Sequence, residues 1–161
     1  MNRRRRRNSN DKAFELLKQA AEGGQRDAQF KLGTHYQWGQ GTKQDYHKAF
    51  KWLQRAAEGG HIDAQAKVGY AYYYGRRVQQ DYSEAYKWFE QAATGGHAGA
   101  LYNVGALYNN GQGVYQDYHE AFRWFKRAAE AGNKKAQTLI NNWRHEKGFG
   151  GNEGREYIAP E

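Results

Sequence analysis

The chain repeats itself every 36 residues, and this period constrains its fold more than any other feature of the sequence. Copies begin at Ser9, Asp45, Asp81 and Asp117, and each carries alanine, glycine and tyrosine at matching positions. A period of about 20 to 50 residues is typical of solenoids, in which each unit packs only against its neighbours. The chain of 161 residues is therefore expected to form one array of stacked units.

Each copy begins with an apolar pattern at helical spacing. In the second copy this pattern runs from Tyr46 to Ala57, while charged residues such as Lys51 fall on the opposite face. The pattern predicts an amphipathic helix of about thirteen residues that ends at Gly59, since glycine tolerates the backbone conformations found at helix ends. Aspartates precede this helix in three copies, where they can accept hydrogen bonds from its first turn: Asp45, Asp81 and Asp117.

A second helical pattern follows in each copy, and it has a glycine in its middle. Gly33, Gly69 and Gly105 occupy equivalent places, although glycine costs about 1 kcal/mol there relative to alanine. Close approach of a neighbouring helix would offset this cost. The repeated small residues therefore indicate where two helices of a unit touch.

These patterns predict an all-α fold, a right-handed α/α superhelical solenoid of about four antiparallel helix pairs. The first of the eight helices is expected at Asp11–Glu22 and the last at Lys134–Lys147. Residues 1–8 are interpreted as a basic disordered head and residues 9–147 as the solenoid. Residues 148–161, which are rich in glycine and have no periodicity, are interpreted as a flexible tail.

Charge and cysteine content narrow the classes of function. The formal net charge is +8, and the run Arg3–Arg7 supplies most of it. There is no cysteine, which excludes disulfides and thiolate metal sites. No apolar run approaches 18 residues and no signal-peptide pattern follows the arginines, so we expect a soluble protein, favour the cytoplasm and expect no membrane insertion.

The polar residues that usually carry catalysis are better explained by structure. His61 and His97 share one repeat position, and His47 and His119 share another, so that equivalent histidines lie too far apart to bind one metal ion. The loop sequence that begins at Gly111, GQG, lacks the lysine and hydroxyl pair of a phosphate-binding loop. We therefore predict no catalytic, metal or cofactor site.

A cluster of tyrosines stands out in the second copy. Tyr72 matches Tyr36 and Tyr108 in the other copies and is predicted to lie in the core. Tyr70, Tyr73 and Tyr74 cannot all share its face, which leaves two interpretations, packing at the edge of the core or contact with a partner.

Two of the copies resemble Sel-one-like (Sel1-like) repeats, a branch of the tetratricopeptide-like helical solenoids. Their sequences are DYHKAFKWLQRAAEGGHIDAQAKVGYAYYYGRRV and DYSEAYKWFEQAATGGHAGALYNVGALYNNGQGV. The resemblance covers about Ser9 to Lys147. The chain departs from the family pattern at Arg76-Arg77, where a glycine is usual, and at Asn141, where the last copy loses its mid-helix glycine. The resemblance implies a non-enzymatic adaptor or scaffold that assembles protein complexes.

A solenoid offers a concave groove that suits an extended peptide or a partner helix. In similar solenoids the first helix of each pair lines this groove. A protein or peptide partner, preferably an acidic one given the basic residues, is therefore expected to bind a monomer of this chain. Nine residues are expected to contact it: Phe50, Lys51, Gln54, Tyr86, Lys87, Glu90, Phe122, Arg123 and Lys126. The alternative is nonspecific binding of a polyanion or nucleic acid through the arginine head and the basic face.

Overall fold

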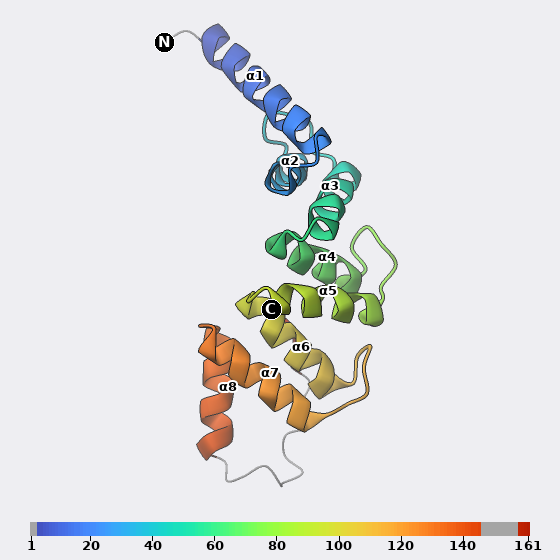
Figure 1. Ribbon diagram of the computed structural model, residues 1–161, viewed down its shortest axis with the longest axis vertical. Coiled ribbons are helices and arrows are strands. Elements are labelled where there is room, and N and C mark those ends of the chain that lie inside the picture. The colour runs from blue at the N-terminus through green and yellow to red at the C-terminus, as the bar shows by residue number, and fades with distance from the viewer. Residues whose placement is uncertain (1–2, 146–157) are drawn as a thin grey trace. The chain divides into compact units, whose positions relative to one another are not determined.

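The computed structural model describes the backbone of residues 3–145 and 158–161, and the side chains of residues 11–143 and 158–161. Within these residues all regular structure is helical and there is no β-strand, which confirms the predicted all-α solenoid (Figure 1). Successive helices pack in antiparallel hairpins. The helices are α1 (Arg3–Glu22), α2 (Arg26–Trp38), α3 (Tyr46–Glu58), α4 (Ile62–Tyr74), α5 (Tyr82–Thr94), α6 (Ala98–Asn110), α7 (Tyr118–Glu130) and α8 (Lys134–His145).

The first helix begins earlier than the sequence pattern indicated. α1 starts at Arg3 rather than at Asp11, so that the backbone of the arginine run is helical in the structure. Arginine is a good helix former, and neither glycine nor proline interrupts the chain before Gly23. The last helix is described to His145, and residues 146 and 147 of its predicted end lie outside the described residues, as do residues 148–157 of the predicted flexible tail. The division into head, solenoid and tail stays a prediction.

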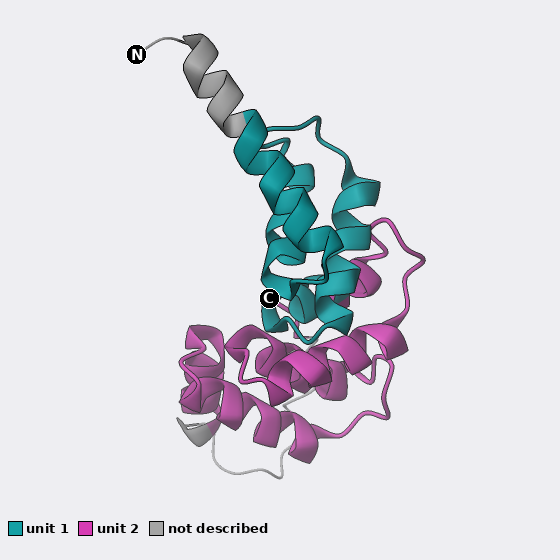
Figure 2. Ribbon diagram, turned by 45° about the horizontal axis from the view of Figure 1, so that its top comes forward, with its two compact units in different colours: residues 1–68 teal, residues 69–161 magenta. Residues whose placement is uncertain are grey.

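The chain forms two compact units, residues 1–68 and residues 69–161 (Figure 2). Unit 1 contains α1 to α3 and the first half of α4. Its core is built around Leu32 and Tyr36 of α2, against which Phe14 of α1 and Trp52 of α3 are packed. Short alanines, such as Ala49, fill the space between these larger side chains and let the helices approach one another.

Unit 2 contains the end of α4 and all of α5 to α8. Its largest fully buried side chains are Phe89, Phe125, Leu107 and Val104. The two phenylalanines occupy equivalent positions of α5 and α7 and anchor successive hairpins. Phe125 also contacts the Trp143 ring of α8, with the ring centroids 5.7 Å apart.

Each mid-helix glycine lies directly against a large side chain of the following helix. A Cβ atom at Gly69 would be 2.7 Å from Phe89 Cδ1, and one at Gly105 would be 2.9 Å from Phe125 Cδ1. In unit 1, a Cβ atom at Gly33 would be 2.9 Å from Leu53 Cγ. These distances confirm the predicted close helix contacts and explain why glycine is tolerated inside three helices.

The predicted aspartate caps are present. The Oδ1 atoms of Asp45 and Asp81 each accept a hydrogen bond of 3.0 Å from the amide three residues later, and Asp117 accepts one of 3.0 Å from the Glu120 amide. The amide of Lys48 is also the main reason why the pKa of Asp45 is lowered. The caps fix where α3, α5 and α7 begin.

The loop after α4 keeps the conformation of the other loops despite its unusual sequence. Gly41 and Gly113 have φ values of 69° and 72°, in the left-handed region that favours glycine. Arg77, at the equivalent position, has a φ of 66°. The loop geometry therefore survives the loss of glycine, and Arg77 bears the steric strain of a left-handed residue with a side chain.

The tyrosine cluster is arranged differently from the prediction. Tyr73 is buried, with 3% of its surface exposed, whereas Tyr72 is only half-buried. The Tyr73 ring packs on Tyr82 of α5 at 5.1 Å, and its hydroxyl donates a hydrogen bond of 3.0 Å to Gln112. Tyr72 thus lies less deep than predicted, whereas Tyr73 follows the packing interpretation, because the loop after α6 covers a side chain that the helical pattern of α4 alone would leave outside.

Among the described residues, no helix combines the length and the apolar character that would be needed to cross a membrane.

Deleting residues 1–9 is expected to leave the melting temperature nearly unchanged. A run of five arginines has no apolar face to bury, and the described core contacts of α1 start at Phe14. Thermal unfolding followed by circular dichroism at 222 nm would measure this, with the full chain as the reference. A large drop in melting temperature would instead show that the head docks on the rest of the chain.

Candidate functional site

The nine residues predicted to bind a partner lie on three helices that follow the aspartate caps. Phe50, Lys51 and Gln54 are on α3 in unit 1. The other six are on α5 and α7 in unit 2, namely Tyr86, Lys87, Glu90, Phe122, Arg123 and Lys126. The use of these residues in binding stays a prediction.

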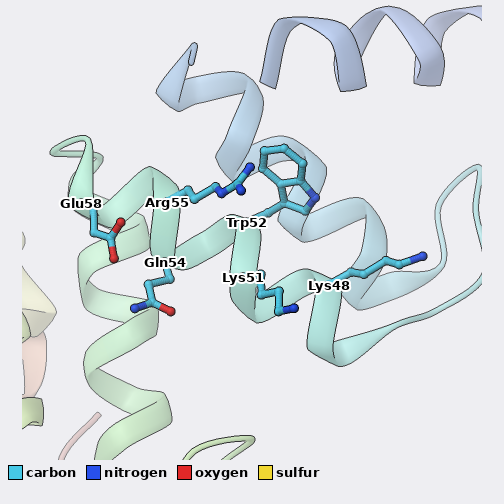
Figure 3. A pocket seen from close by; sticks show the side chains of 6 residues that line it. All are labelled: Lys48, Lys51, Trp52, Gln54, Arg55 and Glu58. Atoms are coloured by element: carbon cyan, nitrogen blue, oxygen red, sulfur yellow. The ribbon is translucent and has the colours of Figure 1, made fainter. Parts of the chain in front are cut away.

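In unit 1, the exposed face of α3 forms a shallow pocket. Figure 3 shows six side chains around it, and they include the predicted residues Lys51 and Gln54. The guanidinium carbon of Arg55 lies 4.8 Å from the centre of the Trp52 ring, a cation–π contact that holds both side chains together. The lining is completed by Lys48 and Glu58. The pocket thus carries three positive side chains and one negative one beside an aromatic ring.

In unit 2, the aromatic members of the predicted series already pack within the protein. The Tyr86 hydroxyl donates a hydrogen bond of 2.8 Å to Glu90 Oε1, and its ring meets Tyr108 of α6 edge-on at 5.8 Å. Burial, followed by the hydroxyl of Tyr108 and the carboxylate of Glu90, raises the pKa of Tyr86 well above its usual range. Phe122 stacks on the Trp143 ring of α8 at 5.4 Å. These contacts hold the helices together.

Two of the three basic members of the series in unit 2, Lys87 and Arg123, are partly neutralised within their own helices. Lys87 Nζ lies 2.5 Å from Glu84 Oε1, and Arg123 Nη1 lies 2.6 Å from Glu120 Oε1. The hydrogen bond with Glu84 raises the pKa of Lys87. This surface therefore offers less free positive charge than the sequence suggests, because each of these cations has an acidic neighbour one helical turn away.

A second surface, which sequence reasoning missed, lies on α6. Residues 158–161 of the same chain are held against it by three hydrogen bonds. Asn110 Nδ2 donates to the carbonyl oxygen of Ile158 at 2.7 Å, and Asn110 Oδ1 accepts from the amide of Ile158 at 3.0 Å. Asn103 Oδ1 accepts from the amide of Glu161 at 2.8 Å. The helix thus binds the main chain of this segment through two asparagine side chains.

The Asn110 side chain is fixed by its neighbours. Its Nδ2 atom donates a second hydrogen bond of 3.2 Å to Gln112 Oε1, which also accepts from the Tyr73 hydroxyl. Its Oδ1 atom accepts a hydrogen bond of 2.9 Å from Asn109 Nδ2. The buried tyrosine of α4 therefore orients the amide that contacts the segment.

The carboxylate of Glu161 lies among tyrosines near the start of α6. Burial raises the pKa of both Tyr70 and Tyr102, and the negative charge of Glu161 adds to the effect in each case. For Tyr70, the amide of Asn103 acts in the opposite direction. A Cβ atom at Gly99, in the first turn of α6, would be 2.7 Å from Glu161 Oε2. The absence of a side chain at Gly99 makes room for the carboxylate.

The histidines have local structural roles. The Nδ1 atoms of His61 and His97 accept hydrogen bonds of 3.2 Å and 3.0 Å from amides in the first turns of α4 and α6. These two histidines therefore cap helices. Across residues 11–143 and 158–161, no group of three or more metal-binding side chains comes together.

The family model for the Sel1 repeat matches the chain four times, at residues 5–25, 26–61, 62–97 and 98–133. Its period agrees with the 36 residues found by self-comparison, but its phase differs. The first match covers most of α1, and the other three family repeats begin with α2, α4 and α6. The copies that start at Asp45, Asp81 and Asp117 begin one helix later, with α3, α5 and α7. The phase decides which helix counts as the first of a pair.

Solved structures of similar proteins show the same architecture. A Sel1 repeat protein from Oxalobacter formigenes is 40% identical, with a TM-score of 0.77, over 80% of this chain and 97% of that one. A protective antigen present in uropathogenic Escherichia coli strains, with an SLR fold, is 39% identical with a TM-score of 0.77. The match covers 83% of this chain but only 28% of the antigen.

A more distant neighbour supports the fold alone. Helicobacter pylori cysteine rich protein B is 20% identical, with a TM-score of 0.63, over 83% of this chain and 96% of that one. A search of curated protein sequences finds no match.

Proposed function

Because this chain belongs to the Sel1 repeat family, we propose that it is a non-enzymatic scaffold that binds a peptide segment of a partner protein in a groove of the solenoid. Sel1 repeat proteins are generally protein–protein interaction scaffolds, and the family is typically non-catalytic. The observation that carries the proposal is the run of four consecutive family repeats over residues 5–133.

The α3 surface supports this role in unit 1. Trp52 and Arg55 form a cation–π pair beside Lys51 and Gln54, and aromatic and arginine side chains commonly dominate the energy of protein interfaces. In unit 2, the predicted residues Lys87 and Arg123 have acidic neighbours, so a ligand carboxylate would compete with Glu84 and Glu120 for them. The preference for an acidic peptide rests on these exposed cations.

The alternative, polyanion binding through the arginine head, receives no support from the comparisons. The side chains of Arg3–Arg7 lie outside the described residues. A salt titration separates the two functions, because polyanion binding falls steeply with salt while aromatic anchors are less sensitive.

Replacing Lys87 and Arg123 together with alanine is expected to weaken partner binding at least tenfold, or about 1.4 kcal/mol, without changing the melting temperature. The partner would first be captured with the full chain as bait in an extract of the source organism and identified by mass spectrometry. Its affinity for each variant would then be measured by calorimetry. A control with the same loss of charge is Lys134→Ala with Lys135→Ala, since both of these lysines are exposed on α8.

Unchanged affinity in the Lys87 and Arg123 variant would remove α5 and α7 from the proposed groove. A loss of affinity on substitution of Tyr74, which is exposed at the end of α4, would instead place the partner on the other set of helices. That set includes the first helices in the phase of the family repeats.

A further inference from the structure

We propose that the face of α6 in unit 2 is a binding site for an extended peptide, and that residues 158–161 of the same chain occupy it as an internal ligand. The segment is Ile158-Ala159-Pro160-Glu161. In this site Asn110 and Asn103 form hydrogen bonds with the main chain of the segment, and the acidic side chain of Glu161 lies near the start of α6. The inference deepens the proposed function, because it names a peptide site, but its test needs no partner protein.

The contact with Ile158 imitates the pairing of two β-strands. In an extended residue the N–H and C=O groups point to the same side, and a side-chain amide offers one acceptor and one donor to match them. Asn110 makes both of these hydrogen bonds to Ile158, at 3.0 Å and 2.7 Å. Recognition of this kind depends on an extended main chain, so it is available to peptides of many sequences.

The spacing of the two asparagines matches the length of the segment. Asn103 and Asn110 are separated by seven residues of helix, which rise about 10.5 Å along the axis. Ile158 and Glu161 are three residues apart, and an extended chain covers about 10 Å over that interval. Ile158 lies at the end of α6 and Glu161 nearer its start, so the segment runs antiparallel to the helix. Two fixed contacts at this distance favour an extended peptide over a helical one.

The start of α6 suits a negatively charged side chain. Glu161 Oε2 would lie only 2.7 Å from a Cβ atom at Gly99, which is in the first turn of the helix. The unpaired amides and the dipole of a helix favour anions at this end. At the position of Gly99, the helices α2 and α4 carry Asp27 and Asp63, which would repel a carboxylate. Glycine at this position therefore removes both a steric and an electrostatic obstacle.

The features that hold the segment are those that set α6 apart from the equivalent helices. At four positions α2 and α4 have the same residue, or both have an aromatic residue, while α6 has a residue of another type. Three of these positions are Gly99, Asn103 and Asn110, and all three contact residues 158–161. The fourth is Leu101, which is buried. Asn103 is itself fully buried, and its Oδ1 atom accepts the hydrogen bond from the Glu161 amide. Its Nδ2 atom has no hydrogen-bond partner among the described residues, so burial of this amide is only partly compensated.

The exposure of the segment defines the ligand class. Pro160 is buried and Ile158 half-buried, whereas Ala159 between them is exposed. This alternation is that of a strand with one face against the protein. The site therefore takes an extended peptide with an apolar residue, a free position, a proline and an acidic residue. A covalently attached segment acts at an effective concentration on the order of millimolar, so a peptide supplied in solution must compete with it.

The test uses a fluorescein-labelled peptide with the sequence of residues 155–161, REYIAPE, and fluorescence anisotropy. It is titrated with the full chain and with a variant that lacks only residues 158–161. We expect the deletion variant to bind at least tenfold more tightly, because its site is free. Equal affinities for the two proteins, or no binding to the deletion variant while its circular dichroism and melting temperature match those of the full chain, would overturn the proposal.

Two further changes test the contacts themselves. In the deletion variant, Asn110→Ala is expected to weaken peptide binding at least tenfold, while Asn142→Ala, an exposed asparagine of α8, serves as the matched control. A peptide methylated on the amide nitrogen of the isoleucine lacks the donor to Asn110 Oδ1 and is expected to bind at least tenfold more weakly. Retained affinity of the methylated peptide contradicts main-chain recognition.

Hydrogen exchange measured by NMR examines the full chain directly. The amides of Ile158 and Glu161 are expected to exchange more slowly than those of an unstructured peptide, and Asn110→Ala is expected to accelerate exchange at Ile158. Unprotected exchange at both amides of the full chain would show that the segment does not occupy the site. Failure to capture a partner protein would bear on the proposed function and leave these results unaffected.

Discussion

Replacing Phe125 with alanine is expected to lower the free energy of unfolding by about 3 to 5 kcal/mol, the largest effect anticipated for this chain. Phe125 is fully buried, and it lies against Gly105 of α6. Its ring also contacts Tyr102 at 5.2 Å and Trp143 at 5.7 Å. Removal of the ring would leave a cavity where three helices meet. Gly105 has no side chain that could move into this cavity, and the backbone around it is held in the helix.

Urea denaturation of the variant and the parent, followed by circular dichroism, measures this difference. Phe125→Leu is the matched control, since it keeps most of the volume and is expected to cost less than about 1.5 kcal/mol. If Phe125→Ala unfolds at the same urea concentration as the parent, the side chain does not join α6, α7 and α8 as described.

Replacing Gly69 with leucine is expected to destabilise the protein by about 3 kcal/mol or more, because the new side chain has no space. A Cβ atom alone would lie 2.7 Å from both Cδ1 and Cε1 of Phe89. Phe89 is itself fully buried and cannot move aside, and its ring also meets Tyr70 edge-on at 5.1 Å. The helices α4 and α5 would have to separate to admit the leucine.

The chain supplies its own control for this substitution. Gly59 follows α3 with a φ of −75°, and the nearest atoms to a Cβ there are at 3.4 Å. The equivalent position after α7 is already an alanine, Ala131, with a φ of −77°. Gly59→Ala is thus expected to change stability by less than about 0.5 kcal/mol. A Gly69→Leu variant that melts within a degree of the parent would refute the close contact between α4 and α5.

The sequence predicted the helices well because their signals are local and recur. A cap such as Asp81 acts on an amide three residues away, and a glycine such as Gly69 marks a contact between helices adjacent in the chain. Each of these signals occurs three or four times along the chain, because the sequence is periodic. A chance pattern would not recur in this way. The start of α1 was less predictable, because the arginine run carries no apolar pattern, yet its residues favour helix.

The predicted binding residues show the limit of the same approach. Repeat positions placed Lys87 and Arg123 among the predicted binding residues, but both are paired with an acidic side chain of their own helix. Such pairs span only one turn and could have been inferred from Glu84 and Glu120. The packing of Tyr86 on Tyr108 could not have been inferred from the sequence, because it depends on how two helices are rotated about their axes. The role of the nine predicted residues in binding a partner stays a prediction.

By itself the sequence determined the all-α repeat architecture, the family and the boundaries of most helices, because these follow from short-range patterns that occur in every copy. Only the tertiary structure decided what residues 158–161 contact. Asn110 and Ile158 are 48 residues apart, and neither Asn103 nor Asn110 recurs at the equivalent positions of α2 and α4. A single contact between distant residues leaves no period in the sequence. It becomes visible only when the helix places both asparagines on one face, at the spacing of an extended peptide.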